Sequence, residues 1–330
     1  MTLEHPLDDE SRAFLSKLEE FNRIEVAPYA DQWDHDEQLP REIFTKAGKI
    51  GLMGIVAPRE YGGRGLSYVT AALAVKELGK VCASLAMDIA AHNALSVGQI
   101  NLFGTEEQKK KYLPRLTSGE WIGGWGLTEP NAGSDTGGIE TKAIEEGDHW
   151  EINGMKHFIT SGRVADLLIV IATTGRTDAG KNEISAFIMM KDQVTPVRKI
   201  HTYGMRASET SELRFTNSKA EILGERGRGR EQALTVLDRG RISIAALAVG
   251  IAFFTGVKTL VKKPTHHDPM VFTKLSDLVQ MEQNHPDQLT PEQRKYLNSL
   301  PPEIKQRALR SPAQTAVNSH QYGSRIAPPK

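Results

Sequence analysis

Two short runs of this sequence combine residue types that suit the binding of a flat aromatic ligand. The first spans residues 125–135 (WGLTEPNAGSD) and the second spans residues 152–162 (INGMKHFITSG). Each places an aromatic residue and a threonine beside a turn, where backbone amides and a hydroxyl can face a ligand. A flavin ring needs such surroundings, namely apolar walls and hydrogen bonds to its polar edge. Together the runs predict a site for a flat, electron-accepting ring.

The first run offers hydrogen-bond donors because its strand must stop early. The proline after Glu129 disfavours helix and ends ladder bonding, so the hydroxyl and amide of Thr128 are left for a ligand. Residues 131–134 tolerate left-handed conformations, so their amides are predicted to form an anion-binding nest, with the Ser134 hydroxyl as a further donor to phosphate. An ordinary turn capped by Ser134 and Asp135 explains the same residues. The first run alone leaves both interpretations open.

Composition excludes several classes of function. The chain has 41 basic and 41 acidic residues, so no global field favours nucleic acid or an anionic membrane. Cys82 is the only cysteine; it predicts a reducing compartment and, in its apolar helical stretch, a buried inert thiol. No run approaches the roughly 18 apolar residues of a membrane span. The acidic start lacks a secretory or transit pattern, which predicts a cytoplasmic protein, or a mitochondrial-matrix one if the chain is eukaryotic and processed.

Residues 7 to about 120 are predicted to be helical. Phe14, Leu18 and Phe21 repeat at the three- and four-residue spacing of an amphipathic helix. Thr105 precedes two glutamates and is a predicted N-cap of a later helix. This part of the chain is therefore expected to form a helical domain.

After Trp121 the pattern changes to short β-rich runs bounded by Gly, Asp and Asn. The Asn153-Gly154 pair lies inside an alternating run and predicts a hairpin turn. Further strands are predicted over residues 167–172, 184–190, 213–215 and 220–223. Apolar residues at helical spacing resume at Glu231. The order is helices, then strands, then a helix.

These patterns predict an α+β fold. We expect a helical N-terminal domain over residues 1–121, a flavin-binding β-barrel or sandwich over 122–225, the first helix of a C-terminal helical bundle over 226–262, and a divergent tail over 263–330. The bundle looks truncated, because the composition shifts after its first helix.

The tail is rich in proline and is predicted to be mobile, because it buries too little apolar surface to offset its ordering entropy. Residues 271–281 and 290–297 are predicted short helices, the second with Thr290 as N-cap. His266, His267 and His320 lack cysteines or clustered acids beside them, so they are predicted to be solvated, and no metal site is expected.

Several motifs resemble consecutive signatures of the acyl-CoA dehydrogenase family. They are Leu127-Thr128-Glu129-Pro130, Ala132-Gly133-Ser134-Asp135, Asn153-Gly154-x-Lys156-x-x-Ile159-Thr160, Gly204-x-Arg206 and Leu237-Asp238-x-x-Arg241. They occur in the family's order and at its spacing, and the similarity covers about residues 7–252. The resemblance implies a helical domain, a β-domain and a four-helix bundle, with FAD between the last two. It also implies α,β-dehydrogenation of an acyl-CoA thioester, with hydride transfer to the flavin N5.

The resemblance further assigns site residues and partners. The flavin ring is assigned to Trp125, Leu127, Thr128, Phe158, Ile159 and Thr160, and the pyrophosphate to Gly133 and Ser134. The acyl-CoA is assigned to Ser134, Lys181, Asp238 and Arg241. Arg206 is expected to be a structural fork rather than a ligand. The implied electron acceptor is an electron-transfer flavoprotein, and a homo-oligomer is possible, although that inference is weakened by the missing bundle.

The glutamate base that the family reaction needs is not found, so the catalytic residue is unknown. In most members it follows a Tyr-Glu-Gly-Thr-like stretch, which does not occur here. Other members carry it two residues after an aspartate that resembles Asp238, and that position is Gly240 here. The alternative to a working dehydrogenase is therefore a catalytically incomplete FAD- or acyl-CoA-binding fragment or subunit. Oxygen chemistry on the same fold is a third interpretation, which the Thr-Glu-Pro and Gly-Ser-Asp combination disfavours.

Overall fold

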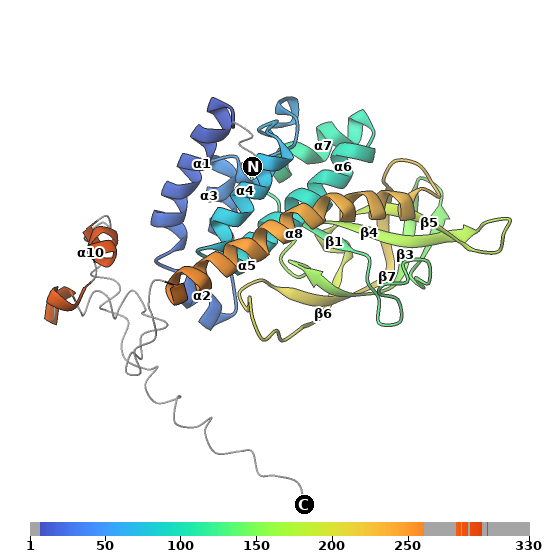
Figure 1. Ribbon diagram of the computed structural model, residues 1–330. Helices are drawn as coiled ribbons and strands as arrows, with labels where there is room; N and C mark the ends of the chain where they lie inside the picture. The colour runs from blue at the N-terminus through green and yellow to red at the C-terminus, as the bar shows by residue number, and fades with distance from the viewer. Residues whose placement is uncertain (1–6, 261–281, 285, 290, 299–301, 303–330) are drawn as a thin grey trace, which may run out of the picture. The chain divides into compact units, whose positions relative to one another are not determined.

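A computed structural model of the protein describes residues 7–260, 282–284, 286–289, 291–298 and 302 (Figure 1). The chain divides into two compact units, residues 1–261 and 262–330. The predicted α+β fold is confirmed in the first unit, where helices precede strands and a long helix follows them. The finer boundaries predicted at residues 121 and 225 stay a prediction.

The first half of this unit is helical (Figure 1). Its helices are α1 (Asp9–Phe21), α2 (Ala30–Asp36), α3 (Arg41–Lys49), α4 (Tyr68–Gly79), α5 (Ala83–Ala91), α6 (Gly98–Phe103) and α7 (Glu106–Thr117). A π-helical turn, His92–Val97, joins α5 to α6 without a break. Thr105 caps α7 as predicted, because its side chain accepts the amide of Gln108 while the Gln108 side chain accepts the amide of Thr105.

The helical domain packs around an apolar core. Phe14 and Leu18 of α1, Phe44 of α3 and Leu78 of α4 are each at most 2% exposed. Cys82 is also buried and accepts a hydrogen bond from the Leu85 amide at the start of α5. Burial raises the pKa of the Cys82 thiol to about 11, so the predicted buried thiol is confirmed.

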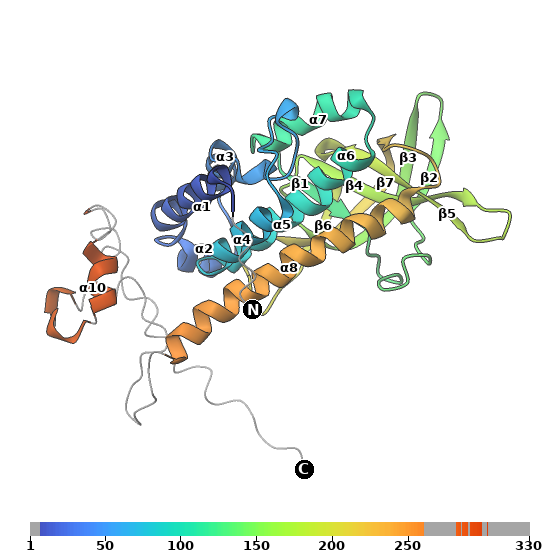
Figure 2. The ribbon, with the colours of Figure 1, turned by 45° about the horizontal axis from the view of Figure 1, so that its top comes forward.

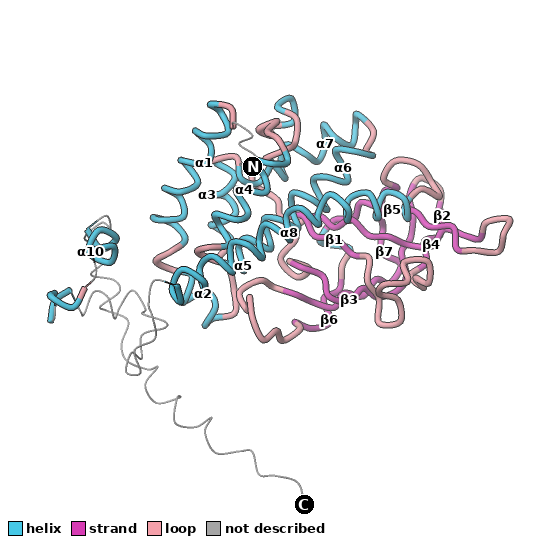
Figure 3. Tube along the Cα trace, viewed as in Figure 1, coloured by secondary structure: helices cyan, strands magenta, loops and turns pink. Residues whose placement is uncertain are grey.

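Seven strands follow and gather on one side of the helices (Figure 3). They are β1 (Gly123–Gly126), β2 (Lys142–Glu146), β3 (His149–Thr160), β4 (Leu167–Arg176), β5 (Asn182–Met190), β6 (Thr195–Lys199) and β7 (Thr210–Ile222). Their order in the sheet is β1-β4-β2-β3-β7-β5, and β6 pairs with β7. Because β5 also pairs with β4, the sheet closes on itself. This closure agrees with the predicted barrel.

Two details of the strand prediction are wrong. Asn153 and Gly154 lie inside β3, and the chain reverses instead between β2 and β3, where Gly147 has a φ of 64°. Gly154 marks a register shift against β7, and a Cβ there would lie 2.8 Å from the Thr141 Cα. The pair is therefore a bulge that lets a neighbouring chain approach closely. The two strands predicted over residues 213–215 and 220–223 are one strand that ends at Ile222, because β7 continues through Asn217 in a left-handed conformation.

Helix α8 (Gly229–Leu260) runs along both domains (Figure 2). It contacts α4, α5 and α6 as well as β4 and β5. A close approach to α4 depends on glycine, since a Cβ at Gly250 would lie 2.4 Å from the Lys76 carbonyl oxygen. The predicted helix after Glu231 is thus confirmed, and it joins the helical domain to the β-domain.

The described part of the second unit contains short helical segments. Helix α10 (Pro291–Asn298) confirms the second predicted tail helix, and Arg294 donates to the Pro286 carbonyl at 2.7 Å. The predictions for residues 271–281, Thr290 and the three tail histidines lie outside the described residues. Among the described residues, no helix is long and apolar enough to cross a membrane.

A buried carboxyl links α5 to the β-domain. Asp88 is 3% exposed and accepts hydrogen bonds from Ser208 at 2.5 Å and Ser161 at 3.3 Å. Burial raises the pKa of Asp88 to about 7, although the two hydroxyls oppose this. The pKa of Glu209 is raised by burial as well.

This carboxyl predicts a pH dependence of stability. An unfolded aspartate has a pKa of about 3.9, so between about pH 4 and pH 7 the native state holds a proton that the unfolded state lacks. The free energy of unfolding is therefore expected to fall as the pH rises through this window, by about 4 kcal/mol from Asp88. Urea denaturation of wild type and Asp88→Asn across this range checks it, with the exposed Asp178→Asn as control. Equal slopes in all three proteins would contradict it.

Candidate functional site

The two sequence runs meet at one cavity. It has a volume of about 190 Å³ and lies between the β-domain and the helical domain. Its lining residues are Ala91, Leu95, Ser96, Gly123, Gly124, Trp125, Leu127, Thr128, Phe158, Ile159 and Thr160. All six residues assigned to a flavin ring are therefore brought together. The first run supplies its residues through β1 and the segment after it, and the second through the end of β3.

A buried ion pair joins the two runs beside this cavity. The Lys156 Nζ atom lies 2.6 Å from a carboxylate oxygen of Glu129 and donates to the Leu127 carbonyl at 2.9 Å. Both side chains are buried, at 0% and 4% exposure. The Glu129 carboxylate also accepts the amides of Glu140 at 2.6 Å and Thr141 at 3.1 Å. Every charged group of the pair is thus compensated.

The environment of each partner explains its pKa. Burial lowers the pKa of the Lys156 ammonium, against the attraction of Glu129. Burial also opposes ionisation of Glu129, but Lys156 and the hydrogen bonds from Thr141 and Glu140 outweigh it, so the pKa of the Glu129 carboxyl is lowered. Sequence reasoning quoted both residues within motifs and assigned neither a role. The usable signal was the presence of opposite charges next to predicted strands, where charges are rarely buried unpaired.

Thr128 and Thr160, the two threonines assigned to the flavin ring, both line the cavity. The Thr128 carbonyl accepts the His157 amide at 2.8 Å, which adds a second link between the runs. Within residues 7–260, neither the Thr128 hydroxyl nor the Thr160 hydroxyl has a hydrogen-bond partner in the protein, and both residues line the cavity. Two donors are therefore available to a ligand.

Phe158 lines the cavity and has an unusual backbone conformation. Its φ is 59°, a left-handed conformation that is rare for an aromatic residue, at a register shift between Lys156 and Ile159. The residue is 59% exposed, and its ring packs at right angles to the His157 ring, with centroids 4.0 Å apart. His157 in turn donates to the Glu212 carboxylate at 2.9 Å. The bulge presents an aromatic surface that no described residue covers fully.

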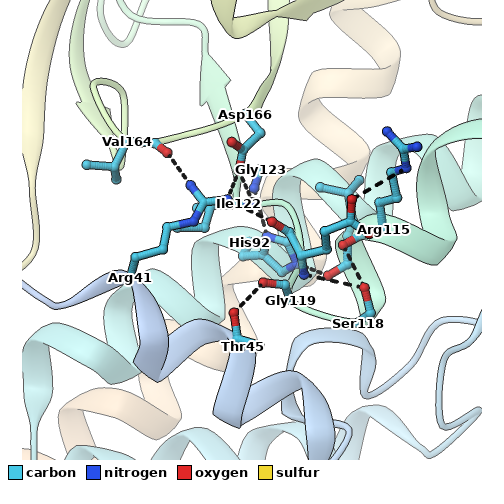
Figure 4. Close-up of polar contacts among 12 residues, drawn as sticks. Arg41, Thr45, His92, Arg115, Ser118, Gly119, Ile122, Gly123, Val164 and Asp166 are labelled. Carbon is cyan, nitrogen blue, oxygen red and sulfur yellow. Dashed lines mark hydrogen bonds and ion pairs between the residues drawn. The ribbon is translucent and has the colours of Figure 1, made fainter.

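Ala91, Leu95 and Ser96 form the helical wall of the cavity. This wall is attached to β1 by uncharged hydrogen bonds (Figure 4). The His92 Nδ1 atom accepts the Gly123 amide at 3.0 Å, so Nε2 carries the proton and faces the carbonyls of Met53 and Leu116. Burial lowers the pKa of His92 to about 4, which keeps this imidazole neutral. Ser96 donates to the Gly124 carbonyl at 2.9 Å. Sequence reasoning did not identify either residue.

Arg41 reinforces the same junction (Figure 4). Its guanidinium donates to the carbonyls of Val164 at 3.1 Å and Glu120 at 2.7 Å, and it pairs with the Asp166 carboxylate. That carboxylate also accepts the Ile122 amide at 2.8 Å. The chain entering β1 is therefore held from two sides.

Some predicted site residues lie away from the cavity. Gly133 and Ser134 follow a tight turn and are exposed, but none of residues 131–134 has a positive φ, so the predicted left-handed nest is wrong. The segment is instead an ordinary turn, because Glu129 and Ala132 exchange backbone hydrogen bonds and Asp135 accepts the Gly137 amide.

The residues assigned to the acyl-CoA do not line the cavity either. Lys181 is exposed in the turn between β4 and β5, where its amide donates to Thr177. Asp238 and Arg241 pair with each other on an exposed face of α8. Arg206 forms a two-pronged contact with the Asp34 carboxylate, at 2.9 and 2.7 Å, which confirms it as a structural fork.

Two comparisons with known sequences bear on this geometry. Residues 8–120 match the family described as acyl-CoA dehydrogenase, N-terminal domain, and residues 124–218 match its middle domain. A probable acyl-CoA dehydrogenase of Bacillus subtilis is 45% identical over 251 residues, which are 74% of this chain and 66% of that protein. The short-chain specific acyl-CoA dehydrogenase of Clostridium acetobutylicum is 46% identical over 240 residues, 71% of this chain and 63% of that protein.

Solved structures agree. Butyryl-CoA dehydrogenase from Megasphaera elsdenii superposes with a TM-score of 0.76 at 34% identity, over 81% of this chain and 73% of that one. The chain belongs to the acyl-CoA dehydrogenase family. A glutaryl-CoA dehydrogenase from Mycobacterium smegmatis, solved in complex with FADH2, gives a TM-score of 0.73 at 27% identity over 93% and 81%. A structure described as the electron transferring flavoprotein of Acidaminococcus fermentans gives 0.74 at 33% identity over 93% and 80%. This chain spans less than two thirds of the length of the Bacillus subtilis and Clostridium acetobutylicum relatives.

The ion pair leads to a stability prediction. Lys156→Met is expected to lower the free energy of unfolding by about 3–5 kcal/mol, because Glu129 is left charged and buried without its partner. Adding Glu129→Gln is expected to recover a large part of this loss. The exposed pair of Arg228 and Glu231 provides a control, since Arg228→Met removes a contact worth about 0–1 kcal/mol. Urea denaturation measures all four proteins, and a loss for Lys156→Met no larger than the control's would refute the prediction.

Proposed function

We propose that this chain provides the FAD-binding domains of an acyl-CoA dehydrogenase and that its cavity takes the isoalloxazine ring. One observation carries the proposal: the residues at positions 125, 127 and 128, in β1 and the segment after it, line the same cavity as residues 158–160 at the end of β3. Membership of the family supports the same assignment.

The residues present fit a flavin. Trp125 and Phe158 offer aromatic walls, and the hydroxyls of Thr128 and Thr160 have no partner among the described residues. Ligand pockets usually exceed about 300 Å³, so a cavity of about 190 Å³ suits a ring system rather than a whole dinucleotide. The remainder of FAD would then lie outside it, where Gly133 and Ser134 are exposed.

The chemistry follows from this placement. FAD, when bound, accepts the hydride that leaves the β-carbon of an acyl-CoA thioester. Thr128 and Thr160 would donate hydrogen bonds to the polar edge of the ring and hold it in register. Trp125 and Phe158 would cover its apolar part and exclude water. Ala91 and the residues near it on the helical wall would face the acyl group.

The proton half of the reaction needs a carboxylate base near the α-carbon. None of the residues that line the cavity has a carboxylate. Gly240 of α8 faces the helical wall, and a Cβ there would lie 3.8 Å from Ala94 and Leu95 in ordinary contact. The alternative function, in which the chain binds FAD and acyl-CoA without turning them over, is distinguished from dehydrogenation by the second test below.

The remaining assignments are part of the proposal. Ser134, Lys181, Asp238 and Arg241 would bind the acyl-CoA outside the cavity, with the cationic side chains facing its phosphates. The proposed electron acceptor is an electron-transfer flavoprotein, and assembly into a homo-oligomer is proposed from the family. A cytoplasmic location is proposed because the lone cysteine suits a reducing compartment.

FAD binding is the first test. The purified full chain, reconstituted with FAD, is expected to retain visible flavin absorbance after gel filtration. Thr128→Val and Thr160→Val are each expected to weaken FAD binding about 3- to 10-fold, the effect of one neutral hydrogen bond. Thr216→Val, at an exposed position of β7, is the matched control and should leave the affinity unchanged. Absence of bound flavin in a folded wild-type protein would refute the proposal.

Turnover is tested separately, by adding butyryl-CoA anaerobically to the FAD-loaded chain and following flavin bleaching. Gly240→Glu is expected to bleach at least about 100-fold faster than Gly240→Gln, because only the glutamate can accept the α-proton. Equal rates for the two variants would show that position 240 does not face the reacting carbon. Bleaching of wild type would support the dehydrogenase, and its absence would support the binding-only candidate.

A further inference from the structure

A chain of hydrogen bonds connects α8 to the cavity wall. The Trp125 indole nitrogen donates to the Gln99 side-chain oxygen at 2.6 Å. The Gln99 amide nitrogen donates to the Gln232 side-chain oxygen at 3.0 Å, and the Gln232 amide nitrogen donates to the Leu223 carbonyl at 3.2 Å. The chain thus joins β1, α6, α8 and the end of the β-domain.

The two ends of this chain fix the direction of every bond in it. An indole N–H can only donate, and a backbone carbonyl can only accept. Gln99 must therefore turn its oxygen to Trp125 and its nitrogen to Gln232, and Gln232 must repeat that orientation toward Leu223. Rotating either amide by half a turn would place two donors or two acceptors against each other.

Burial makes this direction costly to violate. Gln99 is 0% exposed and Gln232 is 2% exposed. A buried amide that loses its partner forfeits the full cost of its desolvation, which exceeds the net gain from making the bond. Gly224, with a φ of 68°, turns the chain immediately after Leu223, and a Cβ there would lie 3.2 Å from the Gln232 nitrogen. The local backbone therefore leaves room for the Gln232 amide.

We propose that Gln99 and Gln232 are positioning residues that hold the Trp125 indole in one orientation at the cavity, so that the first turns of α8 set the shape of its wall. Gln232 acts only through Gln99, and neither side chain lines the cavity. We call this chain of hydrogen bonds, from Trp125 through Gln99 and Gln232 to Leu223, the relay. Its effect on flavin binding rests on the proposed function, whereas the relay itself does not.

The relay is tested without any ligand, in full-length protein labelled with 15N at its four tryptophans. The indole N–H resonance of Trp125, assigned with Trp125→Phe, reports the strength of its hydrogen bond. Gln99→Met is expected to move this resonance upfield, and Gln232→Met is expected to move it in the same direction by a smaller amount. The double variant should match Gln99→Met alone, because both act on one path.

Two further variants keep the test decisive. Gln232→Glu still accepts from Gln99 but cannot donate to Leu223 while ionised, so it should leave the Trp125 resonance closer to wild type than Gln232→Met does. Gln32→Met, at an exposed position of α2, should not move it. The three other indole resonances show whether each variant is folded. An unmoved Trp125 resonance in Gln232→Met, or shifts that add in the double variant, would overturn the relay.

The consequence for the ligand forms a separate arm. Gln232→Met is expected to weaken FAD binding about 3- to 10-fold, the loss expected for one neutral hydrogen bond. If wild type binds no FAD, the proposed function fails while the resonance measurements still decide the relay. If FAD binds equally to wild type and Gln232→Met although the resonance moves, the proposal that the relay shapes the binding wall is overturned.

Discussion

The arrangement of the site depends on the buried ion pair of Glu129 and Lys156. It ties two segments that are far apart in sequence, and it does so directly beside Thr128. Gly126 makes this contact possible, because a Cβ there would lie 3.2 Å from the Lys156 Cγ. The aliphatic part of the Lys156 side chain therefore packs closely against β1 at Gly126. A pair of this kind adds little net stability compared with apolar residues of equal volume, but losing one member is costly. In this structure the pair holds Lys156 of β3 against Leu127 and Glu129 of the first run.

The second constraint is the attachment of the helical residues beside the cavity to β1 and to the segment that leads into it. His92 and Ser96 bind backbone groups of β1, and Arg41 binds the segment that leads into it. These contacts use the main chain of the strand, so the side chains of Trp125 and Thr128 remain available to the cavity. The low pKa of His92 matters here, since a charged imidazole at this buried place would need a counter-ion. The cavity thus lies between the Glu129–Lys156 ion pair on one side and, on the other, the uncharged hydrogen bonds of His92 and Ser96, with the Arg41–Asp166 pair holding the segment that leads into β1.

Periodicity and turn chemistry predicted the helices, the capping of α7 and the change to strands after Trp121, because these depend on neighbouring residues. The hairpin at Asn153-Gly154 failed because the signal for a two-residue turn is also the signal for a bulge, and only the partner strand decides between them. The convergence of the two runs was expected from their matching residue types and from the family resemblance. The contacts that fix it, such as Lys156 with Glu129 and Gln99 with Gln232, join residues that no local pattern relates.

The same contacts also explain why the carboxylate nearest to Thr128 in sequence is not available as a base. Glu129 is the carboxylate that follows Thr128, yet it cannot act as a base. Its oxygens accept from Lys156, Glu140 and Thr141, its pKa is held low, and it does not line the cavity. The Glu129 carboxylate thus faces Lys156 and two backbone amides rather than the cavity. The β-domain side of the cavity is therefore built for holding a ring, and the facing helical side, where α8 passes Ala94 and Leu95 at Gly240, likewise offers no carboxylate among the lining residues.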